Sequence, residues 1–253
     1  MDARDLVVVT GAAGGIGRAT AALLLARGFA VLGVDLAPAV TDLAASEGYE
    51  ALVADVTSAS DLARLRAAVA GRPRAAHLVL AAGGALGEEI DETDPLGPPV
   101  AVFRRSVELN LVAQFDTIRH VVPALAARPP GKRSVTLVSS INAVGDFGYP
   151  AYSAAKAGLA GLMAALTAPL GRLGVRINTV AFGTVLTDRS HQLHDGDTGH
   201  YSALTGLSTL GRLMSAEDAA EVLATVVERL ETVTGTVITA DCGQSVPGFH
   251  ARG

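Results

Sequence analysis

The strongest constraint in this sequence is a series of seven short, continuously apolar runs that alternate with alanine-rich segments. Such runs are typical of strands buried on both faces of a sheet, and the segments between them are typical of helices. Parallel strands need crossover helices of this kind, so the sequence predicts a doubly wound α/β fold of about seven parallel strands with helices on both faces. The runs are LVVVT (6–10), AVLGVD (30–35), EALVAD (50–55), HLVLAA (77–82), SVTLVSS (134–140), VRINTVA (175–181) and GTVITAD (235–241).

Length and composition favour one domain. Hydrophobic residues make up 49% of the 253 residues and charged residues 18%, which is enough apolar surface for one large core without disorder. No linker, repeat or low-complexity tract divides the chain, so we expect residues 1–253 to form a single domain. Residues 84–99 and 183–207 break both apolar periods with Gly, Pro, Asp and Thr, and are predicted as loops near the functional site.

The charge balance and the cysteine content exclude several classes of protein. A net charge of -5 argues against binding to nucleic acid or to anionic lipid. Cys242 is the only cysteine, which rules out an intrachain disulfide and fits a small buried side chain in a reducing compartment. No segment is expected to reach the ~20 apolar residues of a membrane span, and the first strand leaves no room for a signal peptide. We therefore expect a soluble cytoplasmic protein with no membrane partner.

The first strand leads into the glycine-rich segment TGAAGGIG, which opens a helix. Gly11, Gly15 and Gly17 would let the backbone approach a pyrophosphate, while the helix N-terminus supplies unpaired N–H groups. This position in the first strand–helix unit predicts a dinucleotide-binding turn of the Rossmann type, and the alternative is that the glycines serve only packing.

Asp35 ends the second predicted strand. Its carboxylate can accept hydrogen bonds from both hydroxyls of an adenosine ribose and would repel a 2′-phosphate. Neither Gly14 nor Leu36 is basic, so nothing beside it would neutralise that phosphate. The sequence thus favours NAD over NADP.

The stretch YPAYSAAKAG (149–158) places Tyr152 and Lys156 four residues apart, on one face of a predicted helix. The alternative is an ordinary amphipathic helix whose lysine extends to solvent. Free tyrosine, with a pKa of ~10, is a poor acid or base at neutral pH. A nearby ammonium and a nicotinamide cation would lower the pKa of Tyr152 and make it a usable general acid/base.

Together with VSS and with Asn110 in VELNLVAQF, these segments resemble the short-chain dehydrogenase/reductase family over nearly the whole chain. Thr10 and the three glycines match the family's T-G-x-x-x-G-x-G, and Tyr152 and Lys156 match its Y-x-x-x-K. The resemblance implies hydride transfer between a secondary alcohol or ketone and a nicotinamide cofactor, on a small-molecule substrate. It also implies a homotetramer or homodimer. In the family the lysine holds the nicotinamide ribose, the asparagine positions a water, and a serine steadies the reacting oxygen.

The catalytic serine must be chosen between two neighbours. Ser140 is the second serine of the pair, as in most of the family, whereas Ser139 has the family's usual spacing to Tyr152. Strand geometry determines where each side chain points, and the loop NAVGDFG can absorb a one-residue deletion. Ser140 is therefore predicted, and the catalytic set is Asn110, Ser140, Tyr152 and Lys156.

The resemblance also assigns the cofactor contacts and shows where this chain departs from the family. The assigned residues are Gly11, Gly15, Ile16, Gly17, Asp35, Leu36, Asp55, Val56, Ala81, Ala82, Gly83, Tyr152, Lys156, Gly183, Thr184, Val185 and Thr187. Leu80 and Ala81 replace amides that brace the sheet in the family, and Phe182 replaces a proline. Cys242 replaces a glycine in a strand that often builds a tetramer interface.

Two polar clusters are interpreted without a metal site. His191, His194, His200, Asp195 and Asp197 offer ligand types, but they lie in an irregular glycine-rich segment within the family's substrate loop, about residues 183–210. Metal ligands need a rigid surrounding shell, so we expect solvated or substrate-facing side chains and no metal. The acidic stretch GEEIDETD (87–94) is likewise predicted as a solvated loop.

Two other functions are compatible with the motifs. An NADPH-dependent reductase of ketoacyl or polyketide carbonyls is the nearest enzymatic alternative, and Asp35 argues against it. A nucleotide-binding regulator without turnover is the alternative from another class. Such a regulator needs the glycine turn but has no use for Tyr152 and Lys156 together.

Overall fold

All seven predicted runs form strands of one parallel sheet, in the spatial order β3-β2-β1-β4-β5-β6-β9. The computed structural model describes residues 4–92, 94–128, 131–145, 148–193 and 198–246. The strands are β1 (Leu6–Thr10), β2 (Ala30–Asp35), β3 (Tyr49–Val53), β4 (Ala75–Leu80), β5 (Ser134–Ser140), β6 (Arg176–Phe182) and β9 (Val237–Ala240). The predicted α/β class is confirmed as one doubly wound domain.

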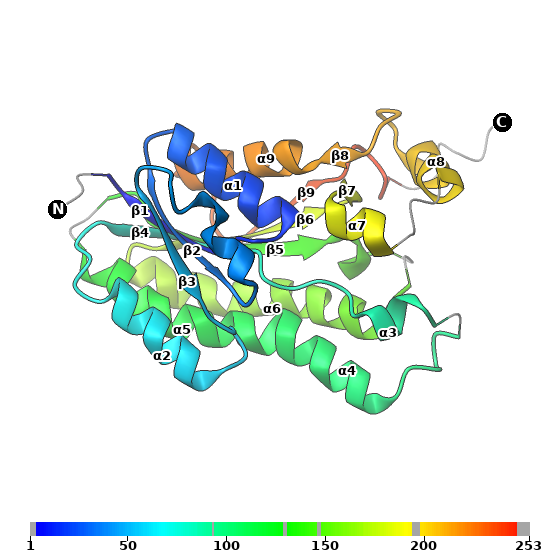
Figure 1. Cartoon of the computed structure of the whole chain (residues 1–253), viewed down its shortest axis with the longest axis horizontal. Coiled ribbons are helices and arrows are strands. Elements are labelled where there is room, and N and C mark those ends of the chain that lie inside the picture. Colours follow the sequence, from blue (N-terminus) through cyan, green and yellow to red (C-terminus); the bar gives the residue numbers. More distant parts are fainter. Residues whose placement is uncertain (1–3, 93, 129–130, 146–147, 194–197, 247–253) are drawn as a thin grey trace.

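Helices cover both faces of the sheet (Figure 1). One face carries α1 (Gly15–Ala26) and α9 (Ala216–Glu228), and the other carries α2 (Ala59–Val69), α4 (Val100–Val107), α5 (Ala113–Ala127) and α6 (Pro150–Arg172). Side chains alternate along β1, so Val7 and Val9 pack in the core below α1 and α9, whereas Leu6 and Val8 pack in the opposite core. Burial on both faces explains why the strand sequences are continuously apolar.

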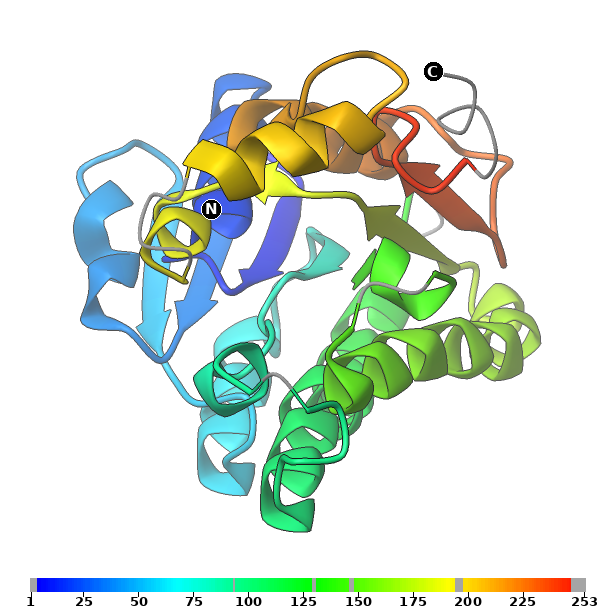
Figure 2. The ribbon, with the colours of Figure 1, turned by 90° about the vertical axis from the view of Figure 1, so that its right-hand side faces the viewer.

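The two segments predicted as loops lie at the carboxyl edge of the sheet, which faces the viewer in Figure 2. Both contain elements that the sequence analysis missed: α3 (Gly87–Ile90), β7 (Val185–Leu186), α7 (Asp188–Leu193) and α8 (Thr198–Leu207). β7 pairs in parallel with β8 (Met214–Ser215). The prediction of irregular loops was wrong there, because such short elements give no periodic signal. Local caps define them instead, as where Thr187 Oγ1 accepts from the Ser190 N–H at 3.1 Å.

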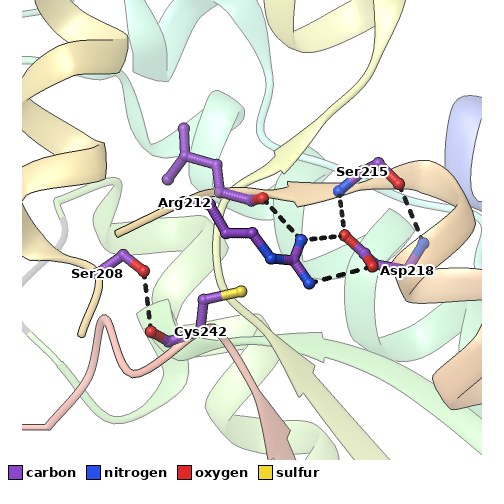
Figure 3. Close-up of polar contacts among 6 residues, drawn as sticks. Ser208, Arg212, Ser215, Asp218 and Cys242 are labelled. Atoms are coloured by element: carbon purple, nitrogen blue, oxygen red, sulfur yellow. Dashed lines mark hydrogen bonds and ion pairs between the residues drawn. The ribbon is translucent and has the colours of Figure 1, made fainter. Parts of the chain in front are cut away.

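Polar contacts near Arg212 attach the segment after α8 to the turn that follows β9 and to α9 (Figure 3). Ser215 and Asp218 form a capping box at the start of α9, and Arg212 pairs with the Asp218 carboxylate. Ser208 Oγ donates to the Cys242 carbonyl at 2.9 Å. Cys242 was predicted to be buried, but its side chain is partly exposed. It occupies a turn with φ of 54° in which its sulfur points toward Arg212.

By length and composition, α6 is long and apolar enough to cross a membrane, with a mean hydropathy of 1.2 over the best window. One such helix is weak evidence for a membrane span, because the core helix of a folded domain passes the same test. The high value comes from the Ala and Leu residues of the helix. Leu159, Met163 and Leu170 of α6 belong to the core beneath the sheet, so the apolar composition serves packing in this domain.

Candidate active site

A cavity of about 550 Å³ lies at the carboxyl ends of β1, β2 and β4, where the strand order reverses between β1 and β4. Open α/β sheets bind their ligands at this position. Of the predicted cofactor residues, Gly11, Gly15, Asp35, Leu36, Asp55, Val56, Ala81, Ala82 and Gly83 line the cavity. It is also lined by Ala13, Gly14, Val34, Ala37, Ala39, Ala54, Leu109, Asp188, Arg189 and Gln192. Ala13 and Gly14 belong to the glycine motif itself, whereas no motif pointed to the α7 residues.

The glycine turn forms a cradle that side chains would fill. A Cβ on Gly11, whose φ is 70°, would lie 2.7 Å from the Ala81 carbonyl carbon, and one on Gly17 would lie 2.1 Å from the Gly11 carbonyl oxygen. α1 starts behind Gly14, and no side chain caps it. Its first N–H groups can therefore take an anion, which fits a dinucleotide pyrophosphate. Ile16 and Gly17 shape the turn but do not line the cavity.

Asp35 is held rigidly at the far wall of the cavity. Its Oδ2 accepts from the Ala13 N–H at 3.0 Å and its Oδ1 accepts from the Ala37 N–H at 2.9 Å. The bond to Ala13 connects the end of β2 to the glycine turn. The carboxylate is thus fixed beside exposed Leu36, where a ribose hydroxyl donor would meet it.

Asn110 is fully buried in a π-helical turn, η2 (Glu108–Val112), between α4 and α5. Its Oδ1 accepts from the Gly84 N–H at 2.9 Å, and its Nδ2 donates to the carbonyls of Gly84 at 3.1 Å and Ser106 at 3.0 Å. The amide therefore connects the helix to the segment that follows β4. π turns are frequent at functional sites.

Ser139 and Ser140 point in different directions. Ser139 Oγ donates to the main-chain carbonyl of Lys156 at 3.1 Å, which attaches β5 to α6. Ser140 Oγ donates to Asn142 Oδ1 at 2.8 Å, and its nearness to the Tyr152 phenol lowers the pKa of that phenol. Only Ser140 of the two faces Tyr152.

Tyr152 and Lys156 lie together on α6, with Lys156 Nζ 5.5 Å from the centre of the Tyr152 ring. Lys156 is 4% exposed, and its ammonium donates to the Val138 carbonyl at 2.9 Å. Burial lowers the pKa of Lys156 to about 8.

Burial also raises the pKa of Tyr152 above its ordinary value, more than Ser140 and the Arg189 charge lower it. This direction is opposite to the predicted depression. The protein groups around the phenol do not by themselves favour its ionised form, because the cost of burying a phenolate is larger than their combined effect.

A protein-family model described as Enoyl-(Acyl carrier protein) reductase matches residues 11–245. A solved oxidoreductase of the short-chain dehydrogenase/reductase family from Burkholderia thailandensis has a TM-score of 0.84 and 31% identity, over 95% of this chain and 92% of that one. The chain belongs to the short-chain dehydrogenase/reductase family.

Two of the curated relatives are named as dehydrogenases of hydroxylated compounds with a six-membered ring. The 2,5-dichloro-2,5-cyclohexadiene-1,4-diol dehydrogenase of Sphingobium indicum is 29% identical, over 94% of this chain and 95% of that protein. The cis-4-hydroxycyclohexanecarboxylate dehydrogenase of Sinomonas cyclohexanicum is 32% identical, over 95% and 96%. The predicted family is confirmed, and this short-chain dehydrogenase/reductase is an NAD(P)-dependent oxidoreductase acting on hydroxyl groups.

Gln114 supplies an amide near the positions where Leu80 and Ala81 replace the amides of the family. Its Nε2 donates to the Ala82 carbonyl at 3.0 Å and to the Leu109 carbonyl at 2.9 Å. The end of β4 is therefore fixed from α5 rather than from the strand itself. Gln114 lies four residues after Asn110 on the same helical segment, a spacing that could have identified it.

The segment GTVLT is positioned by the C-terminal turn. A Cβ on Gly183 would lie 2.3 Å from Gln244 Oε1, and that oxygen accepts from the Thr184 N–H at 2.7 Å. Val185 is buried in the core, and Thr187 lies against Gly15. Gly183, Thr184, Val185 and Thr187 do not line the cavity. Phe182, beside Ser140 in the sheet register, is also buried in the core.

The histidine cluster is only partly visible. His194, Asp195 and Asp197 lie outside the described residues. The rings of His191 and His200 lie 5.2 Å and 5.6 Å from that of Tyr201. Among the residues that the structure describes, no three His, Cys, Asp or Glu side chains form a group that could hold a metal ion.

Proposed function

We propose that this protein is an NAD-dependent dehydrogenase that oxidises a secondary alcohol on a six-membered ring to the ketone, with Asn110, Ser140, Tyr152 and Lys156 as its catalytic set. The observation that carries the proposal is that the Ser140 hydroxyl lies beside the Tyr152 phenol at the carboxyl edge of the sheet, with Lys156 Nζ 5.5 Å from the centre of the tyrosine ring. Two hydroxyls that converge in this way can both reach one substrate oxygen.

NAD is the proposed cofactor because Asp35 presents a fixed carboxylate at the ribose end of the cavity. A 2′-phosphate there would meet a negative charge with no basic partner from Leu36. Asp35→Ala should reduce the preference for NADH over NADPH, measured by fluorescence titration of both cofactors. Equal affinities in the parent protein would overturn the assignment.

In the proposed mechanism, Ser140 donates a hydrogen bond to the substrate oxygen and Tyr152, in its ionised form, takes the hydroxyl proton. When bound, the nicotinamide cofactor would supply a positive charge and the acceptor for the hydride, and the glycine turn, Asp35 and Lys156 would hold it. In the reverse direction the Tyr152 phenol gives the proton back to the ketone oxygen. Because the pKa of Lys156 is about 8, its ammonium is largely charged at neutral pH and can also hold a ribose hydroxyl.

The substrate class is proposed from the relatives, which act on a cyclohexadiene diol and on a hydroxycyclohexane carboxylate. Screening cyclic and open-chain secondary alcohols with NAD, followed by absorbance of the reduced cofactor, tests both the activity and the ring preference. Turnover of open-chain alcohols only would refute the ring assignment.

Tyr152→Phe should abolish turnover while keeping NADH affinity within a few fold, since the ring and its packing remain. Lys156→Ala should abolish turnover and also weaken NADH, because it removes the proposed ribose contact. Both effects are measured by steady-state kinetics and NADH titration. A Tyr152→Phe enzyme with parental turnover would refute the mechanism.

We also propose a cytoplasmic homotetramer or homodimer. Phe103, Val112 and Phe115 on the α4–α5 helices are 42%, 43% and 40% exposed, an apolar surface of the kind that subunit contacts cover. Light scattering gives the mass directly, and a monomer at micromolar concentration would contradict the proposal.

A further inference from the structure

Glu89 was predicted to lie in a solvated acidic loop, but the structure buries it. It belongs to α3 and is 2% exposed, whereas the neighbouring Glu88 is exposed and pairs with Arg105 at the surface. Glu89 Oε1 accepts from the Ala151 N–H at 2.9 Å and from the Tyr152 N–H at 3.2 Å. Its second oxygen, Oε2, is buried without a hydrogen-bond partner in the described part of the chain. Burial of a carboxylate in this state is costly and needs an explanation.

The explanation lies at the start of α6. Tyr149 occupies the N-cap with φ of 54° and makes no side-chain cap, and Pro150 has no N–H to donate. The first free N–H groups of the helix are those of Ala151 and Tyr152, and Glu89 accepts from both. A negative charge at this end of a helix also interacts favourably with the helix dipole. Glu89 thus caps α6 from a different element, because no residue of the helix can do so.

We propose that Glu89 is a positioning residue for Tyr152: through the main chain of Ala151 and Tyr152 it holds the phenol in place between Ser140 and Lys156. This inference rests on the role proposed for Tyr152 above. The bond to the Tyr152 N–H connects α3 directly to the residue whose side chain is proposed to move the proton. A shift of about 1 Å in a reacting group can reduce turnover by orders of magnitude.

The charge of Glu89 has a second effect on the same residue. Ser140 from β5 and Lys156 from α6 lie beside the Tyr152 side chain, and Arg189 from α7 and Glu89 from α3 act on its phenol through their charges. Ser140 and Arg189 lower the pKa of Tyr152, and Glu89 raises it. Glu89 therefore positions the phenol and also opposes its ionisation.

Two substitutions separate the hydrogen bonds from the charge. Glu89→Gln keeps an acceptor oxygen and the side-chain volume but removes the charge, and Glu89→Ala removes both. Glu88→Gln is the matched control, because it removes one charge from the adjacent, exposed position of the same helix.

Amide hydrogen exchange at Ala151 and Tyr152, followed by NMR in the full-length protein, tests the positioning without any need for activity. Glu89→Ala should speed exchange of these two amides by about tenfold or more, as expected for loss of a buried acceptor. Glu89→Gln should stay within a few fold of the Glu88→Gln control. Unchanged exchange in Glu89→Ala would overturn the proposal, even if the protein oxidised no alcohol at all.

The pH profile of alcohol oxidation tests the connection to the phenol. In Glu89→Gln the rise of kcat/KM with pH should move to lower pH by roughly half a unit relative to Glu88→Gln, because one nearby negative charge is gone. Glu89→Ala should lose about tenfold or more in kcat with NADH affinity within a few fold, since α3 is remote from Asp35. A Glu89→Gln profile that superimposes on the control, or an Ala variant with full kcat, would overturn the role.

Discussion

Ser139 and Ser140 are adjacent in β5, and the alternation of a strand turns their hydroxyls to different partners. Ser139 is used for structure, since its hydroxyl bonds to the main chain of α6. Ser140 faces the Tyr152 phenol. The directions of the two hydroxyls therefore favour Ser140, which strand geometry predicted, over Ser139, which has the family's usual spacing to the tyrosine.

Exchanging each serine for alanine tests this difference. Ser140→Ala should cost roughly 10²-fold or more in kcat, which is typical for loss of a placed donor to a reacting oxygen. Ser139→Ala should leave kcat within a few fold and lower the melting temperature, because a buried bond to α6 is lost. Steady-state kinetics and thermal unfolding measure the two effects. A larger loss of kcat in Ser139→Ala than in Ser140→Ala would show that the spacing to Tyr152, and not the strand geometry, identifies the catalytic serine.

Among the elements, the segment from Gly183 to Thr187 is shaped by contacts far along the chain. Gln244 is 7% exposed; its Oε1 accepts from the Thr184 N–H, and its Nε2 donates to the Leu204 carbonyl of α8 at 3.3 Å. One amide thus connects Thr184, directly before β7, to α8. Both of these segments belong to the predicted substrate loop, so Gln244 fixes the spacing between them.

Gln244→Ala should raise KM for the alcohol by about five- to tenfold and lower the melting temperature by about 2–4 °C, with kcat changed less, since the lost bonds orient the wall and not the reacting groups. Gln244→Glu keeps the acceptor for Thr184 and loses the donor to Leu204. Its KM should therefore fall between those of the parent and the alanine variant. A Gln244→Ala variant with the parental KM would show that Gln244 does not orient the wall of the substrate site.

At the scale of the whole molecule, the amino side of the sheet contains a buried histidine. His77 in β4 is 1% exposed, lies 2.8 Å from Ser134 Oγ through Nδ1, and packs edge-on against Phe29. Burial lowers the pKa of His77 from 6.5 to about 3. Folding therefore requires a neutral ring, while the unfolded chain protonates it below pH 6.5.

Because the unfolded state binds the extra proton, the contribution of His77 is fully present above pH 6.5 and is lost as pH falls toward 3. The free energy of unfolding should decrease by up to about 1.4 kcal/mol per pH unit from this group. His77→Leu should be less stable than the parent at pH 7.5, with Ser134 unpaired, and the gap should narrow at pH 5 in urea titrations. A gap independent of pH would show that His77 does not titrate on unfolding.

The sequence by itself determined the features that depend on local periodicity and short motifs: seven parallel strands, the glycine turn at the start of α1, Asp35 at the end of β2, and the shared helical face of Tyr152 and Lys156. Those patterns follow from burial on two sheet faces and from helical geometry, which neighbouring residues encode. The NAD preference and the catalytic roles stay predictions.

Only the tertiary structure decided the contacts between residues distant in the chain. The cap that Glu89 provides for α6, the amides of Gln114 and Gln244, and the raised pKa of Tyr152 all depend on elements that meet only in the folded protein. The acidic sequence around Glu89 is typical of a solvated loop, and it would be the same whether the Glu89 side chain were exposed or buried. Its burial is set by the position of α3 against the first turn of α6, which no local pattern specifies.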